Sequence, residues 1–207
     1  MKLYLSTYKI GNKTEILKQW ISTNDNKVVV IANALDCFPA GLRKNQHIAA
    51  DLDQLLQCGF DPVRLDLRNY FDNSMALTNL LATYRVFYVL GGNTFVLRAA
   101  MKLSGFDDYL NSIVHKTDFL YAGHSAGICV LANDLHPLAL VDDPDLYPYD
   151  YRQTIYQGLG WLDYLPLPHY QSAHPESKLI DKTKEYCEQN HLSYQTLRDG
   201  EVIITEI

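Results

Sequence analysis

Ser125 stands at the centre of a Gly-x-Ser-x-Gly pattern at residues 123–127. In a nucleophile elbow, this pattern forms a sharp strand-to-helix turn that exposes the serine hydroxyl to a cleft. The apolar run 119–122 predicts the strand, and residues 126–132 have the composition of a helix start. The Ala126 N–H would then face developing negative charge as an oxyanion donor. Ser125 is therefore a candidate nucleophile, and the alternative is a serine that only caps a helix.

A second small-residue turn, residues 91–94, follows the predicted strand 86–90. A backbone amide of Gly91 or Gly92 is a candidate to complete an oxyanion hole beside Ser125. Asn93 or the threonine after it would cap the helix that follows. The alternative is a simple strand–turn–helix connection in which glycine only satisfies the backbone torsions.

A serine nucleophile needs a base, and histidine is the usual one because its pKa lies near neutrality. His169 follows an apolar run and lies in a proline-stiffened segment, which would hold an imidazole in place. His174 and His191 are the alternatives, and we expect His124 to point away from Ser125. The histidines expected on the surface or in loops are His47, His115 and His136.

The base in turn needs an acid that orients it. Asp199 precedes Gly200 in a tight turn between two predicted late strands, where a hairpin would aim its carboxylate inward. The alternative is an Asp-Gly pair that forms only a type I′ hairpin turn.

The elements that must position these residues alternate between apolar strands and amphipathic helices. We predict strands at 3–7, 28–32, 63–67, 86–90, 119–122 and 202–207, and helices at 48–56, 96–103, 106–113 and 176–190. This order is typical of an α/β three-layer sandwich, a mostly parallel sheet with helices on both faces. The candidate turns would meet at the carboxyl ends of the strands. Residues 1–207 form one predicted domain, in which residues 134–170 are irregular and cover the site.

The composition excludes several classes of protein. The 207 residues are 47% hydrophobic and 20% charged, and no apolar run is long enough to span a bilayer. A formal net charge of −6 opposes nucleic-acid binding. The four cysteines are scattered without a C-x-x-C pair, so no zinc site is indicated. We expect a soluble cytoplasmic protein without metal or organic cofactor, and a monomer or homodimer.

Taken together, the turns at 91–95, 123–127, 168–170 and 197–200 resemble the peptidase E family of serine peptidases, within the class I glutamine amidotransferase-like superfamily. The resemblance implies that Ser125 is the nucleophile, His169 the base and Asp199 the acid of a triad, in this chain order. It also implies that the backbone amides of Gly92 and Ala126 are the oxyanion donors. An α/β-hydrolase esterase has the order serine, acid, histidine. That alternative would need a different pair, such as Asp163 with His191.

The predicted function is hydrolysis of short peptides through an acyl-enzyme. The resemblance also implies cleavage after an acidic residue, as in a dipeptidase. Asn93 and Arg152 are the predicted substrate-binding residues, with Arg98 a second candidate cation. We expect residues 142–151, which are acidic and rich in tyrosine, to narrow the cleft. The rival function is a non-catalytic metabolite-binding or regulatory protein of the same fold.

Overall fold

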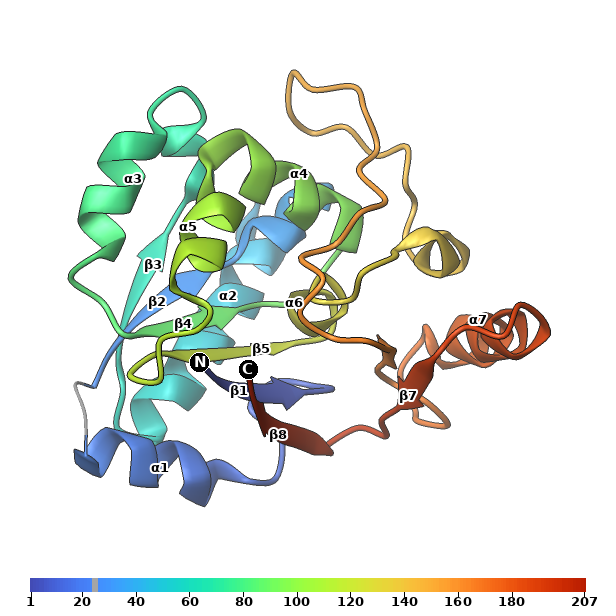
Figure 1. Ribbon diagram of the computed structural model, residues 1–207, viewed down its shortest axis with the longest axis horizontal. Coiled ribbons are helices and arrows are strands. Elements are labelled where there is room, and N and C mark those ends of the chain that lie inside the picture. The colour runs from blue at the N-terminus through green and yellow to red at the C-terminus, as the bar shows by residue number, and fades with distance from the viewer. Residues whose placement is uncertain (24–25) are drawn as a thin grey trace.

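The computed structural model describes residues 1–23 and 26–207 and contains a central six-stranded sheet (Figure 1). The strand order is β3-β2-β4-β5-β1-β8, and every pair is parallel except β1 with β8. The strands are β1 (Lys2–Ser6), β2 (Lys27–Ile31), β3 (Asp61–Leu65), β4 (Val86–Val89), β5 (Leu120–His124) and β8 (Val202–Glu206). The predicted mostly parallel α/β sheet is confirmed.

Alternate residues of the central strands face two separate hydrophobic cores, as strand geometry requires. On β2, Val29 and Ile31 face one core, and Val28 and Val30 face the other. Helices α3 (Ser74–Leu81), α4 (Thr94–Ser104), α5 (Phe106–Ile113) and α6 (Ala126–Cys129) pack on the first core, and α1 (Thr14–Thr23) and α2 (Leu42–Gln57) pack on the second. The molecule is thus a three-layer sandwich.

The helix over the second small-residue turn has clear start and stop signals. Asn93 caps α4, because its side-chain oxygen accepts a hydrogen bond from the Val96 N–H. Gly105 ends the helix in the left-handed conformation. Among the described residues, no helix is long and apolar enough to cross a membrane.

A separate parallel pair of strands carries the two late candidate residues. Strand β6 (Leu165–Leu167) pairs with β7 (Tyr194–Thr196), and α7 (Ser177–Gln189) connects them. Figure 1 shows α7 and β7 to one side of the main sheet. His169 follows the end of β6 and Asp199 follows the end of β7, so this small β-α-β unit brings them to the same edge.

The predicted hairpin around Asp199 is wrong. Strand β7 pairs with β6, whereas β8 pairs with β1 in the main sheet, so the Asp-Gly turn connects two different sheets. Residues 134–170 are also less irregular than predicted. They contain the 3-10 helix η3 (His136–Leu140) as well as β6. Two further 3-10 helices, η1 (Asn33–Cys37) and η2 (Leu67–Tyr70), follow β2 and β3.

We predict that Gly127→Ala destabilises the fold by about 1–3 kcal/mol, because an added methyl group would overlap the Val89 carbonyl of β4. Gly41→Ala is the matched control, because no atom lies within 4 Å of its added carbon and its φ of 168° is extended backbone. Urea unfolding measures both. Equal stability of the two variants would contradict the close approach of α6 to β4.

Candidate active site

Ser125 occupies the strained turn that the sequence predicts. It lies between β5 and α6 with φ 51° and ψ −120°, outside the usual region for a residue with a side chain. Gly91 lies opposite, where an added Cβ would come 2.8 Å from the Ser125 Cβ. Glycine at this position therefore leaves room for the serine side chain. Such strain is found where the surrounding structure holds a functional group in place.

His124 fixes the neighbouring turn. Its Nε2 accepts a hydrogen bond of 3.2 Å from the Gly91 N–H, and its Nδ1 lies 3.3 Å from the Tyr88 hydroxyl. Burial lowers the pKa of His124 to about 3, so the ring is neutral and carries its proton on Nδ1. Because the Gly91 amide is engaged, Gly92 is the donor that this turn leaves for an oxyanion. The sequence alone left both glycines open.

His169 and Asp199 form a hydrogen-bonded pair, with 2.7 Å between Nδ1 and Oδ1. The His169 side chain is 1% exposed and the Asp199 side chain is 32% exposed. An ionised carboxylate only accepts, so Nδ1 carries the proton and Nε2 is left as the acceptor. His169 has φ 61°, and its N–H donates to Thr7 Oγ1 after β1. The backbone is thus held in a conformation that directs this ring.

Ser125 and His169 line one cleft of about 120 Å³ at the carboxyl ends of the parallel strands. Its other lining residues are Tyr8, Leu35, Phe38, His47, Gly91, Gly92, His124, His174 and Glu176. Within the described part of the chain, the Ser125 hydroxyl makes no hydrogen bond, to His169 or to any other group. In an unliganded site this contact is often long and tightens when substrate binds.

His174 stacks on His169, with 3.8 Å between ring centroids and 14° between ring planes. Its Nδ1 accepts a hydrogen bond from the Glu176 N–H. Burial lowers the pKa of His174, and the charge of His169 lowers it further. The sequence offered His174 only as a rival base. In the structure it covers the face of the predicted base instead.

Three groups of the cleft could in principle hold a cation, since one ligand atom from each of His169, His174 and Glu176 lies within 4.8 Å of the others. The stacking opposes this use. Imidazole lone pairs lie in the ring plane, so one ion cannot lie in the planes of two stacked, nearly parallel rings. His169 also has Nδ1 bound to Asp199. Metal binding would therefore require rotation of at least one ring.

Two partly buried carboxyl groups, Glu176 and Asp142, give the cleft a pH-sensitive charge. Partial burial and the negative charge of Asp142 together raise the pKa of Glu176 to about 7. Burial also raises the pKa of Asp142 to about 6, although Asp142 accepts a 2.8 Å hydrogen bond from the Thr94 N–H at the start of α4. Negative charge therefore accumulates near the cleft between about pH 6 and pH 7.

The two predicted substrate-binding residues, Asn93 and Arg152, do not line the cleft that contains Ser125. Asn93 is 5% exposed, and besides capping α4 it donates to the Asp143 carbonyl. Its amide thus holds the segment over the site. Arg152 is exposed and does not line the cleft. Arg98 is buried in an ion pair of 2.9 Å with Asp107, so it is not available as a cation for the substrate.

The rival residues lie apart from Ser125. Asp163 and His191 are exposed and do not line its cleft. His47 lies on the surface, as predicted, with its side chain 47% exposed, but it also lines the cleft. Tyr8, which follows β1, was also missed. Tyr8 could have been predicted as a site residue, because sites form at the carboxyl ends of parallel strands.

A strained serine turn and an imidazole–carboxylate pair at the edge of a mostly parallel α/β sheet are typical of serine hydrolases. The model of Peptidase family S51 matches residues 12–206, so the chain belongs to this family. The predicted resemblance to peptidase E is thereby confirmed.

One curated relative and two solved structures are similar to this chain, and the solved structures show the same fold. The "Uncharacterized peptidase Lin0382" of Listeria innocua is 29% identical over 139 residues, which are 66% of this chain and 62% of that protein. A candidate peptidase E protein from Listeria monocytogenes EGD-e has a TM-score of 0.76 and 22% identity, with 100% of this chain and 98% of that chain covered. A peptidase from an acI-B1 Actinobacterium has a TM-score of 0.72 and 16% identity, with 99% and 83% covered.

We predict that His124→Leu lowers stability by about 1–3 kcal/mol, because it leaves the buried Gly91 N–H without an acceptor. It should also lower kcat more than it changes KM, since the Gly92 amide would lose its fixed direction. Tyr88→Phe keeps the Nε2 acceptor and is the control. If His124→Leu matches wild type in both stability and kcat, His124 does not hold this turn.

Proposed function

We propose that this peptidase hydrolyses short peptides through a triad of Ser125, His169 and Asp199. The observation that carries the proposal is the 2.7 Å bond between His169 and Asp199, because it leaves the free Nε2 in the cleft that Ser125 lines. Ser125 would attack the peptide carbonyl while His169 accepts its proton. Asp199 would hold the imidazole tautomer and stabilise the imidazolium that forms.

The negative charge on the carbonyl oxygen would develop between two backbone amides. Ala126 begins α6 directly after the serine, and Gly92 lies in the turn that His124 holds. Their N–H groups would stabilise the tetrahedral oxyanion. The imidazolium would then donate its proton to the leaving amine, and water activated by the same histidine would hydrolyse the acyl-enzyme.

The size of the cleft supports short peptides as substrates. A volume of about 120 Å³ admits a few atoms beside the serine rather than a folded chain. The segment after residue 141 is fixed above the site by Asp142 and by the Asn93 bond to Asp143. A small peptide substrate and a cytoplasmic monomer or homodimer remain part of this proposal.

A library of dipeptides with varied first residues tests the function directly. We predict turnover by the wild-type protein and none by Ser125→Ala, because removal of the hydroxyl prevents acyl-enzyme formation. Preference for an acidic first residue would support the dipeptidase assignment. Equal turnover by Ser125→Ala, or binding of peptides without turnover, would contradict the proposal and favour the binding protein.

The acid of the triad has its own test. Asp199→Asn should lower kcat on the order of 10⁴-fold, the loss known for the corresponding change in a serine protease triad, because an amide favours the wrong imidazole tautomer. Asp163→Asn is the matched control and should retain full activity. Melting temperatures of both variants separate lost chemistry from lost folding. A fully active Asp199→Asn enzyme would remove Asp199 from the triad.

The pH profile tests His169 as the base. Burial lowers its pKa below the usual 6.5, against the raising effect of Asp199. The neutral base is therefore present above that pKa, and kcat/KM should fall only as the pH drops below 6.5. The double variant Asp142→Asn/Glu176→Gln removes the two carboxyl groups that titrate near pH 6 and pH 7, so a fall that remains in this variant belongs to an imidazole of the cleft. A midpoint well above 6.5 in both proteins would contradict the assignment.

A further inference from the structure

A second cavity adjoins the cleft on the other side of Phe38. Phe38 is 56% exposed and lines both the cleft with Ser125 and this cavity of about 290 Å³. Residues that follow β2, the start of α2 and the end of β3 form its walls, together with Pro148 and Tyr149 of the covering segment. The cavity therefore adjoins the proposed peptide site, and the Phe38 side chain lies between the two.

The charge of this cavity is opposite to that of the protein. Its lining contains the cations Lys44, Arg64 and Arg68 and the single carboxylate Asp36, whereas the whole chain carries a net charge of −6. Clustered charge of one sign in a concave surface attracts ligands of the other sign. We call this feature the basic cavity.

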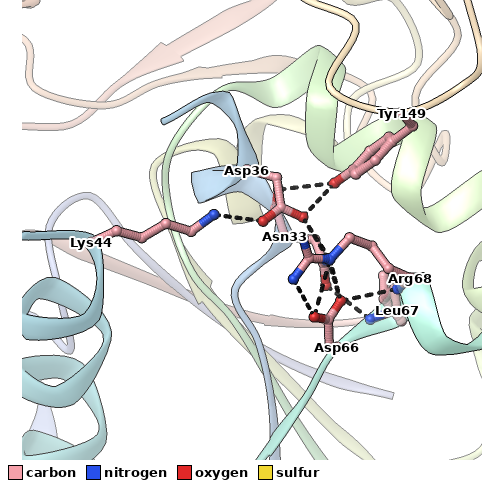
Figure 2. Close-up of polar contacts among 7 residues, drawn as sticks. All are labelled: Asn33, Asp36, Lys44, Asp66, Leu67, Arg68 and Tyr149. Atoms are coloured by element: carbon pink, nitrogen blue, oxygen red, sulfur yellow. Dashed lines mark hydrogen bonds and ion pairs between the residues drawn. The ribbon is translucent and has the colours of Figure 1, made fainter. Parts of the chain in front are cut away.

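Asp36 offsets part of the positive charge of the basic cavity and also holds two of its cations in place, because its carboxylate pairs with Lys44 and its Oδ2 lies 3.7 Å from the Arg68 Nε (Figure 2). Its carboxylate is 6% exposed and accepts 2.6 Å and 2.7 Å hydrogen bonds from Lys44 and from the Tyr149 hydroxyl. Asn33 donates a third bond, at 2.8 Å, to the same group. The oxygens of Asp36 are thus occupied from the protein side, while Lys44 keeps further N–H donors.

A second carboxylate orients Arg68. Asp66 accepts hydrogen bonds from the Arg68 Nε and Nη2 atoms, as Figure 2 shows. Although partial burial raises the pKa of Asp66, hydrogen bonds from Arg68 and Asn33 lower it to about 2. This pair is therefore ionised at any physiological pH. Among the described residues, the remaining Arg68 nitrogen, Nη1, has no protein partner.

Arg64 supplies a cation without a counterion. It lies on β3 opposite Val30 of β2, is exposed, and forms no ion pair or hydrogen bond within residues 1–23 and 26–207. Arginine presents a planar set of donors that matches a carboxylate. Gly41 begins α2 at the wall without a side-chain cap, which adds the positive end of a 16-residue helix.

We propose that the basic cavity binds a carboxylate of the peptide substrate, at a position beyond Phe38 from the residue that Ser125 attacks. The choice of a peptide carboxylate rests on the proposed function, because the adjoining cleft would hold the peptide. The anion site itself rests on Arg64, Arg68 and Lys44. The cavity thus selects among peptides by a second group, apart from the bond that is cleaved.

Binding to the full-length Ser125→Ala protein tests this without catalysis. Three tripeptide amides are used, each with a single glutamate at a different position. Calorimetry compares the binding of each with that of the same peptide carrying glutamine in place of glutamate. At one position glutamate should bind about tenfold more tightly, and 0.5 M NaCl should reduce this preference. Equal binding of glutamate and glutamine at all three positions would overturn the proposal.

Arg64→Gln, introduced into the same protein, assigns the preference to the basic cavity. It should reduce the glutamate preference to less than twofold, whereas Arg43→Gln, on the outside of α2 and away from the lining, should retain it. Melting temperatures confirm that both variants fold. A preference that survives Arg64→Gln, or inorganic phosphate binding with no glutamate preference, overturns the assignment. If the wild-type protein does not hydrolyse peptides but the glutamate preference is observed, the triad is contradicted and the proposal for the basic cavity is not.

Discussion

The hydrogen bond between His169 and Asp199 is the contact on which the proposed chemistry depends. Neither residue belongs to the main sheet, whereas Ser125 directly follows its strand β5. The bond forms because β6 and β7 are parallel and end at the same edge, and α7 makes the connection between them. The positive φ of His169 and its N–H bond to Thr7 then join this small unit to the end of β1. The main sheet and the β6-α7-β7 unit thus meet at the cleft that Ser125 and His169 line.

The site also depends on small residues that permit close approach. Gly91 leaves room for the Ser125 side chain, and Gly127 lets α6 begin beside the Val89 carbonyl. An added Cβ on Gly92, which has φ 143°, would overlap the Ala34 carbonyl. The glycines around the nucleophile therefore have a steric purpose, and His124 adds the one polar contact that fixes which amide of the 91–92 turn stays available.

The sequence predicted the parts of the structure that depend on local pattern. The central strands β2, β4 and β5 are largely buried apolar runs, and the elbow and helix cap follow from residue types within a few positions. The partner of β7 could not be predicted, because a three-residue strand has no pattern that distinguishes pairing with β6 from a hairpin with β8. The role of Asn93 depends on its hydrogen bond to Asp143, fifty residues later in the chain. The role of His174 depends on how its ring stacks on His169. Neither contact can be predicted from the spacing of residues in the sequence.

The most direct test of the triad is the reaction of the protein with a fluorophosphonate, followed by mass spectrometry of its peptides. A serine activated by a neighbouring imidazole reacts with this reagent, whereas an ordinary serine hydroxyl does not. We predict one adduct per chain, located on Ser125 and formed more slowly as the pH falls below 6.5 and His169 becomes protonated. No adduct, or an adduct on another residue, would contradict the assignment of Ser125 as the nucleophile.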